Sequence, residues 1–485
     1  MGLPSDGRAG QSLDPDRETG DMANQRGPAY AALEELTKLT SLPAENAVEI
    51  TGDDPVLPTR YRIGTAGAAL QAATGLAAAA LWKLRTGRSQ SVSVDLPAAT
   101  ISLRSSRYMR IAGREPDREF ALLMRFYPTK KNRWLFLHTN FPNLRDAALR
   151  ILGVPDDRDA VAAAIAGWDG EALETALHEG GACGSFVRTH EEWAAHPHAA
   201  AVAALPAVEI IRIGDAPPRP LPDSNRPLGG VRVLDLTRVI AGPTCARTLA
   251  EHGADVLKIT RAGLPDSGQL DLDTGIGKLS AQLDLRERDQ HAKLLELAST
   301  ADVFSQSYRP GTLAARGFSP EALAELRPGI VYVTLSAWGH EGPWRNRRGY
   351  DTIVQSATGM AEASGDANGP KLLPVSAIDY VGGNLMAFGA MVALHRRATE
   401  GGSWLVRTSL AQTGRWITQR GVLAPEVYRA APEDLPPEVI AGLCTEVDAP
   451  DGRIRYLAPI VRMSETPARW VRPPVPLGHD PAAWP

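Results

Sequence analysis

The sequence has few cysteines and no surplus of charge of one sign. Its three cysteines, Cys183, Cys245 and Cys444, are odd in number and far apart, so neither a disulfide framework nor a cysteine metal site is indicated. Lys and Arg number 52 against 56 Asp and Glu, a formal charge of −4. Because the chain lacks a basic excess, neither nucleic acid nor an acidic membrane is expected as a partner.

The N-terminus also lacks an apolar run. Residues 1–25 are polar and acidic, which excludes a signal peptide over this stretch. The most membrane-like window, 65–82, is mostly alanine and contains Gln71 and Thr74. Since alanine contributes little to bilayer insertion, we interpret this window as a packed interior helix. We therefore expect a cytoplasmic protein without membrane contact.

The first half of the chain predicts a short lead, a long helix and a smaller α+β region. We expect a disordered lead at 1–27 and a proline-rich linker at 216–228. The α+β region spans about 120–210. The elements expected in this half are a helix at 65–85, a strand at 91–96, an extended segment at 134–138 and helices at 145–152 and 157–166.

Strands and helices alternate in the second half. The elements expected there are strands at 231–236, 255–259, 301–304 and 330–335, and helices at 242–252 and 320–326. This order predicts an α/β fold with an open, mainly parallel, Rossmann-like sheet that binds ligands at the carboxyl ends of its strands. No GxGxxG follows the first of these strands, so a nicotinamide cofactor is not expected.

A lone acid, Asp379, precedes the pair Gly382–Gly383 and a long apolar run that predicts a helix. Backbone N–H groups are free to face a ligand at such a place, although capping of the helix is the alternative. A similar pattern occurs at 57–87 without the acid, because no carboxylate lies between Asp54 and Asp95.

Seven segments resemble one known family, in that family's order. They are GVRVLDLTRVIAGP at 230–243, GADVLKI at 253–259, KLSAQLDL at 278–285, ADV…YRPG at 301–311, VYVTLSAWGHEGPW at 331–344, GYDTIVQSATG at 349–359 and the segment around Asp379. Together they resemble the family III CoA-transferases of the CaiB/BaiF type, which include formyl-CoA, carnitine and bile-acid CoA-transferases. An α-methylacyl-CoA racemase is a relative.

The resemblance implies a fusion of two units. Residues 28–215 are similar to a truncated first unit that includes the small α+β domain. Residues 229–420 resemble the CoA-binding α/β domain, and 421–485 form a shortened C-terminal region. We expect the first unit's small domain to substitute for the one that the second unit lacks. The family forms interlocked dimers, so a homodimer is expected.

The resemblance implies transfer of CoA between an acyl-CoA and a carboxylic acid, with CoA as co-substrate and no permanently bound cofactor or metal. Asp379 would be the nucleophile, passing through an aspartyl anhydride and an aspartyl-CoA thioester. Gly382 and Gly383 would leave room for acyl groups and an oxyanion. Positions that resemble CoA contacts are Val239, Ala241, Lys258, Lys278, Arg309 and Gly311.

Two positions depart from relatives. Ile240 stands where formyl-CoA transferase has glutamine, which argues against formate and oxalate. Tyr350 stands where the racemase has a proton-transferring histidine, and a tyrosine is a poor base near neutral pH. A racemase or isomerase, and a non-catalytic acyl-CoA-binding subunit that completes a partner chain, remain the alternatives. In the first unit, Thr65 or Ala66 aligns with Asp379.

Overall fold

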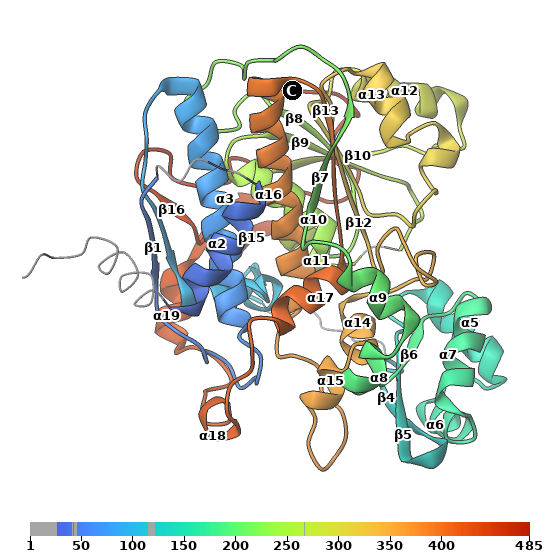
Figure 1. Cartoon of the computed structure of the whole chain (residues 1–485). Helices are drawn as coiled ribbons and strands as arrows, with labels where there is room; N and C mark the ends of the chain where they lie inside the picture. Colours follow the sequence, from blue (N-terminus) through green and yellow to red (C-terminus); the bar gives the residue numbers. More distant parts are fainter. Residues whose placement is uncertain (1–26, 41, 43–45, 115–121, 266) are drawn as a thin grey trace, which may run out of the picture.

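A seven-stranded sheet forms the centre of the computed structural model (Figure 1). The structure describes residues 27–40, 42, 46–114, 122–265 and 267–485. The lead predicted at 1–27 lies outside the described residues, apart from Gly27. In sheet order the strands are β10 (Lys278–Gln282), β9 (Asp255–Thr260), β8 (Arg232–Leu236), β11 (Val303–Gln306), β12 (Val331–Ser336), β13 (Ser403–Ser409) and β7 (Glu209–Gly214).

The first six strands run parallel, and β7 is antiparallel to β13 at one edge. Alternate apolar residues of each strand face opposite sides of the sheet, as the two-residue period of a strand requires. One side packs against α10 (Ala241–Glu251) and α16 (Ala377–Glu400), the other against α12 (Arg288–Ala298) and α13 (Pro320–Leu326). The predicted open, mainly parallel α/β sheet is confirmed.

Two long helices pack together beside this sheet. They are α3 (Ile63–Thr86) and α16, each 24 residues long and apolar enough to cross a membrane by length and composition. In the structure, however, 94% of the apolar window of α3 and 100% of that of α16 are buried inside the protein. The expected packed interior helix at 65–82 is therefore what the structure contains.

A smaller sheet, with two strands from the first half of the chain, has the same strand directions as one edge of the large sheet. It consists of β1 (Val48–Thr51), β2 (Val92–Asp95) and β16 (Arg462–Met463). β1 is parallel to β2 and β16 is antiparallel to it, just as β12 is parallel to β13 and β7 is antiparallel to β13. Each sheet thus receives its last strand from the other half of the chain.

The small domain lies at the lower right of Figure 1, beside the carboxyl ends of the large sheet. Its core is an antiparallel sheet of three strands under three helices. Its elements are β4 (Arg125–Thr129), η2 (Lys130–Asn132), β5 (Arg133–Leu137), α5 (Pro142–Leu152), α6 (Arg158–Ala166), α7 (Gly170–Glu179) and β6 (Gly184–Phe186). The connection back to β7 consists of α8 (His190–Ala194) and α9 (Pro197–Ala203).

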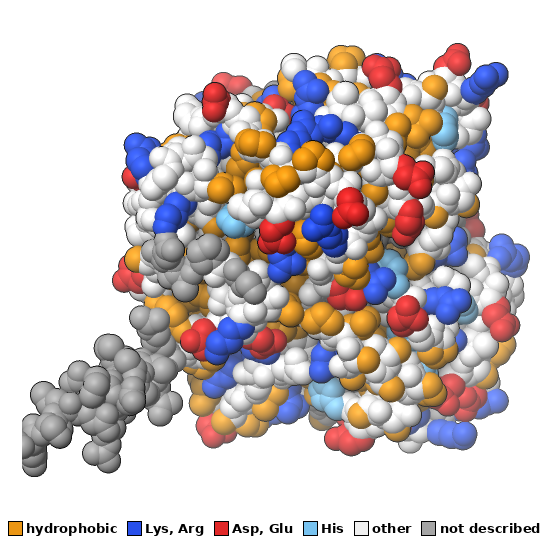
Figure 2. Space-filling view, turned by 45° about the horizontal axis from the view of Figure 1, so that its top comes forward, with side chains coloured by type: hydrophobic (Ala, Val, Ile, Leu, Met, Phe, Trp, Pro, Cys, Tyr) orange, Lys and Arg blue, Asp and Glu red, His pale blue; other side chains and the backbone are white. Residues whose placement is uncertain are grey.

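The remaining elements surround these parts. They are α2 (Pro28–Thr40), α4 (Leu96–Ser102), η1 (Ser105–Tyr108), β3 (Arg110–Ile111), α11 (Gln269–Gly275), η3 (Ala314–Arg316), α14 (Asp351–Ala357), α15 (Met360–Ala363), α17 (Leu410–Thr418), α18 (Pro425–Tyr428), α19 (Pro437–Leu443), β14 (Cys444–Ala449) and β15 (Gly452–Leu457). On the face that Figure 2 draws, basic and acidic side chains are interspersed, in keeping with the small net charge.

The helices and strands whose bounds are predicted above are present, with ends within three residues of the prediction. In the large sheet, the sequence did not identify β7, β10 or β13. The proline-rich linker at 216–228 connects β7 to β8, and both strands lie in the same sheet.

The close packing of α3 against the small sheet makes Gly75 sensitive to substitution. A Cβ at Gly75 would lie 2.6 Å from Val92 Cγ1 and 2.7 Å from Val461 Cγ2. We expect Gly75→Ala to lower the free energy of unfolding by about 1–3 kcal/mol through overpacking. Urea denaturation measures it. Gly442→Ala is the control, because this exposed helical glycine has nothing within 4 Å of such a Cβ. Equal destabilisation of both variants would contradict the packing argument.

Candidate active site

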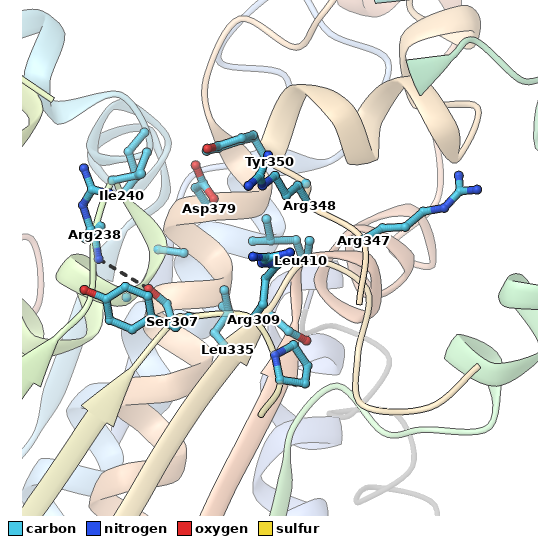
Figure 3. A pocket seen from close by; sticks show the side chains of 18 of the residues that line it. Arg238, Ile240, Ser307, Arg309, Leu335, Arg347, Arg348, Tyr350, Asp379 and Leu410 are labelled. Atoms are coloured by element: carbon cyan, nitrogen blue, oxygen red, sulfur yellow. Dashed lines mark hydrogen bonds between the residues drawn. The ribbon is translucent and has the colours of Figure 1, made fainter. Parts of the chain in front are cut away.

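A cavity of about 260 Å³ lies at the carboxyl ends of β8, β11 and β12 (Figure 3). Its walls come from the loops after these strands, the segment before α14, the first turn of α16 and the small domain. The lining residues discussed below include Phe141, Arg238, Val239, Ala241, Arg309, Arg348, Tyr350 and Asp379.

Asp379 lies in the first turn of α16, with 7% of its surface exposed. Figure 3 shows its carboxylate between Arg238 on one side and Tyr350 on the other. Burial raises the pKa of Asp379 well above its usual range, and the charge of the nearby Asp351 raises it further. Among the described residues that line the cavity, Asp379 is the one acid.

Asp351, at the start of α14, caps the N-terminus of α16. Its Oδ2 accepts the backbone N–H of Ile378 at 2.9 Å and that of Asp379 at 3.1 Å, and the Gln355 amide donates to Oδ1. Burial raises the pKa of Asp351 to about 6, although these donors oppose the shift. The sequence left helix capping open as a role for Asp379, but the capping carboxylate belongs to Asp351.

Gly382 and Gly383 do not line the cavity. They lie inside α16, where a Cβ on Gly383 would collide with the carbonyl oxygen of Ala241 in α10. A Cβ on Gly382 would lie 3.2 Å from Thr413 Oγ1 in α17. The structure thus places both glycines where helices approach closely and outside the lining of the cavity.

The predicted CoA contacts divide into two groups. Val239, Ala241 and Arg309 line the cavity, and Gly311 lies in the same loop as Arg309 with a φ of +81°. Val239 has a φ of +70°, a strained value for a β-branched residue, which occurs at functional sites. The second group is formed by the two lysines.

Neither predicted lysine reaches the cavity, because both are buried in ion pairs. Lys258 Nζ lies 3.0 Å from Asp271 Oδ1. Lys278 Nζ lies 2.7 Å from Asp235 Oδ2 and donates to the carbonyl of Pro243 at 2.8 Å. Burial lowers the pKa of Lys278 to about 8, against the opposing effect of Asp235. The sequence pattern could not reveal these carboxylate partners.

Among the cavity residues that the sequence did not single out are two arginines and one aromatic residue of the small domain. Arg238 and Arg348 form no ion pair within the described part of the chain; Arg238 donates to the carbonyl of Pro265 and Arg348 to that of Gly181. Phe141 comes from the small domain, and the Arg238 guanidinium lies 5.6 Å from the centre of its ring. The sequence offered one signal for these residues, because Arg238 directly precedes Val239, which was predicted to contact CoA.

A second cavity, of about 280 Å³, adjoins the first, and both are lined by Tyr308 and Thr312. It lies at the carboxyl ends of β8 and β9 and is largely apolar, with arginines at its edge. Arg261 and Arg286 both contact Asp284 there, and Arg316 also lines it. The two cavities therefore lie next to each other at the carboxyl ends of the parallel strands.

The first half contains a structural counterpart of the capped acid. Asp54 accepts the N–H of Gly64 at 3.0 Å and that of Thr65 at 2.7 Å, at the start of α3. Asp351 makes the same pair of contacts at the start of α16, so Thr65 occupies the position of Asp379. Of the two alignments left open by the sequence, the geometry supports Thr65 over Ala66.

The sequence profile described as CoA-transferase family III matches residues 44–211 and 228–438, well over half of the chain. The chain belongs to CoA-transferase family III. This confirms the resemblance stated from the sequence motifs.

Curated members of the family are similar over parts of the chain. An acetyl-coenzyme A transferase of Hypoxylon pulicicidum is 29% identical over 418 residues, covering 75% of this chain and 70% of that protein. The succinyl-CoA:glutarate CoA-transferase of Homo sapiens is 33% identical over 189 residues, covering 36% and 43%. This family III chain therefore spans less than half the length of the human relative.

A relative from Mycobacterium tuberculosis also has a solved structure. This probable fatty acyl-CoA transferase is 31% identical over 234 residues, covering 45% of this chain and 59% of that protein. Its crystal structure aligns with a TM-score of 0.39 at 30% identity, covering 40% of this family III chain and 57% of the solved chain.

The raised pKa of Asp379 predicts a stability cost at neutral pH. An acid whose pKa is raised by folding favours the protonated form, so ionisation above the unfolded pKa of about 3.9 destabilises the native state. We expect Asp379→Asn to raise the thermal midpoint at pH 7, with the gain disappearing near pH 4. Asp366→Asn is the control, since Lys371 lowers the pKa of Asp366 and the expected shift has the opposite sign. A gain independent of pH would contradict this linkage.

Proposed function

We propose that this chain transfers CoA between an acyl-CoA and a free carboxylic acid, with Asp379 as the nucleophile. The observation that carries the proposal is one buried carboxylate in a cavity at the carboxyl ends of a parallel sheet. Family membership supports the reaction, since relatives carry names such as succinyl-CoA:glutarate and formyl-CoA:oxalate CoA-transferase.

The proposed reaction balances without oxidant or water. The Asp379 carboxylate attacks the thioester carbonyl and the C–S bond breaks. CoA departs as the thiolate, and the acyl group remains on Asp379 as a mixed anhydride. The thiolate attacks the Asp379 carbonyl of the anhydride, which releases the first acid and leaves an aspartyl-CoA thioester. The acceptor carboxylate then displaces the thiolate to form a second anhydride, and attack of the thiolate on the acyl carbonyl restores Asp379.

The buried environment suits this chemistry. Weak solvation leaves the ionised carboxylate more nucleophilic than a hydrated one, and exclusion of water protects the anhydride from hydrolysis. The same burial raises the pKa of Asp379, so the ionised form prevails only above the ordinary range for a carboxylic acid. Activity is accordingly expected to fall at acidic pH.

For CoA itself, we place the pantetheine along Val239 and Ala241 in the first cavity and the adenine nucleotide in the second. Arg238, Arg309 and Arg348 have cationic groups suited to phosphate oxygens. Phe141 of the small domain would close the occupied site. This agrees with the expectation that the small domain of the first unit replaces the one that the second unit lacks. The assignment of two units, the homodimer and the cytoplasmic location remain predictions.

The alternatives have less support. Burial raises the pKa of Tyr350, so its phenol stays protonated and is unsuited to abstract an α-proton. A non-catalytic acyl-CoA-binding subunit would not require a buried acid at the cavity. The transferase proposal needs no base at Tyr350 and gives the buried Asp379 a role.

Replacing Asp379 tests the proposal directly. We expect Asp379→Ala and Asp379→Asn to abolish exchange between an acyl-CoA and a free acid, measured by mass spectrometry of the CoA esters formed. In the native protein incubated with an acyl-CoA, hydroxylamine should displace CoA thiolate from the aspartyl-CoA thioester and leave a hydroxamate on Asp379. Thr65→Ala, at the corresponding position of α3, is the control and is expected to retain activity. Substantial turnover in Asp379→Ala would refute the assignment.

Arg348 tests the proposed phosphate contacts. A charge-assisted hydrogen bond contributes about 1.5–3 kcal/mol, so Arg348→Gln should raise KM for the acyl-CoA roughly 10- to 100-fold with a smaller effect on kcat. Arg345→Gln is the control, because Arg345 is exposed in the same segment and does not line the cavity. Steady-state kinetics with varied acyl-CoA distinguish the two. An unchanged KM in Arg348→Gln would remove Arg348 from the binding site.

A further inference from the structure

His138 of the small domain lies directly against the segment that carries Asp351. It follows β5 and is 4% exposed. Its ring stacks on that of Tyr350 with the centres 4.0 Å apart and the planes inclined by 9°. His138 Nδ1 and Thr352 Oγ1 form a hydrogen bond of 3.1 Å. One imidazole from the first half thus contacts both residues that flank Asp351.

The segment that His138 contacts is hydrogen-bonded to the first turn of α16, which carries Asp379. Tyr350 lines the cavity, and Asp351 accepts two backbone N–H groups in the first turn of α16. Tyr350 precedes α14 and provides no side-chain cap for it. A shift of the ring of Tyr350, or of Thr352, would therefore move the carboxylate that holds the N–H of Asp379.

The polar character of His138 needs an explanation. Burial lowers its pKa to about 3, so the ring is neutral and adds no positive charge beside the two acids. Within the described residues its Nε2 has no hydrogen-bond partner. A buried polar atom without a partner is unfavourable, and a phenylalanine would stack equally well without it. What the imidazole adds is the directional bond to Thr352.

We propose that His138 is a positioning residue of the transfer reaction: the first half of the chain supplies an imidazole that fixes Tyr350 and Thr352, and through Asp351 sets the position of Asp379. The inference rests on the proposed function for its kinetic consequence. Its geometric consequence, the order of the first turn of α16, does not depend on any activity.

Two variants remove the directional bond while keeping the stacking or the side-chain shape. We expect His138→Phe and Thr352→Val each to lower kcat by roughly 10- to 100-fold, the range for a small misplacement of reacting groups. KM for the acyl-CoA should stay within about twofold. The double variant should be no worse than either single one, because both remove the same bond.

His196→Phe is the matched control. His196 also belongs to the first half, stacks on Trp193 at 5.5 Å and accepts one hydrogen bond, from the N–H of His198. It does not line the cavity around Asp379. This variant should leave kcat unchanged per folded molecule.

Deuterium exchange provides a readout without turnover. The amides of Ile378 and Asp379, both donated to Asp351, should exchange faster in His138→Phe and Thr352→Val than in the native chain. Unchanged exchange together with unchanged kinetics, or a lower thermal midpoint alone, would overturn the positioning role. If the native chain does not transfer CoA, the proposed function fails, and the exchange rates at these two amides alone decide the role of His138.

Discussion

The hydrogen bonds from the first turn of α16 to Asp351 are the contacts on which the site depends. A helix N-terminus stabilises an anion placed on its free N–H groups. Asp351 takes that position, so Asp379 lies beside it without the same stabilisation. Burial and the neighbouring negative charge then raise the pKa of Asp379. The N-terminus of α16 therefore holds Asp351 in place and leaves Asp379 poorly solvated.

The exchange of strands explains how distant segments meet around these acids. β7 leaves the small domain and joins the large sheet beside β13, whereas β16 returns from the C-terminal region to β2. Because β7 is anchored in the large sheet, the small domain is held near the carboxyl ends of the strands. Phe141 and His138 thereby contact residues more than 90 positions away, Arg238 and Tyr350.

Local patterns in the sequence were sufficient for most of the fold. Pro243 after an apolar strand marked the start of α10, and the alanine-rich window marked α3. Contacts between distant residues were beyond these patterns. Lys278 looked like a phosphate ligand until the structure paired it with Asp235, 43 residues away. The motif around Asp379 indicated the proposed nucleophile, but the contact of its N–H with Asp351 depends on how α14 packs against α16.

The two halves separate what the fold needs from what the chemistry needs. Asp54 caps α3 as Asp351 caps α16, so the cap persists in a half that has Thr65 in place of the acid. A threonine hydroxyl could hold an acyl group only as an ordinary ester, and because it has no carboxyl carbon it cannot carry CoA as a thioester. The small sheet β1-β2-β16 also has no counterpart of β8 or β11, whose following loops line the cavity. An acid placed at position 65 would therefore lack the walls that surround Asp379.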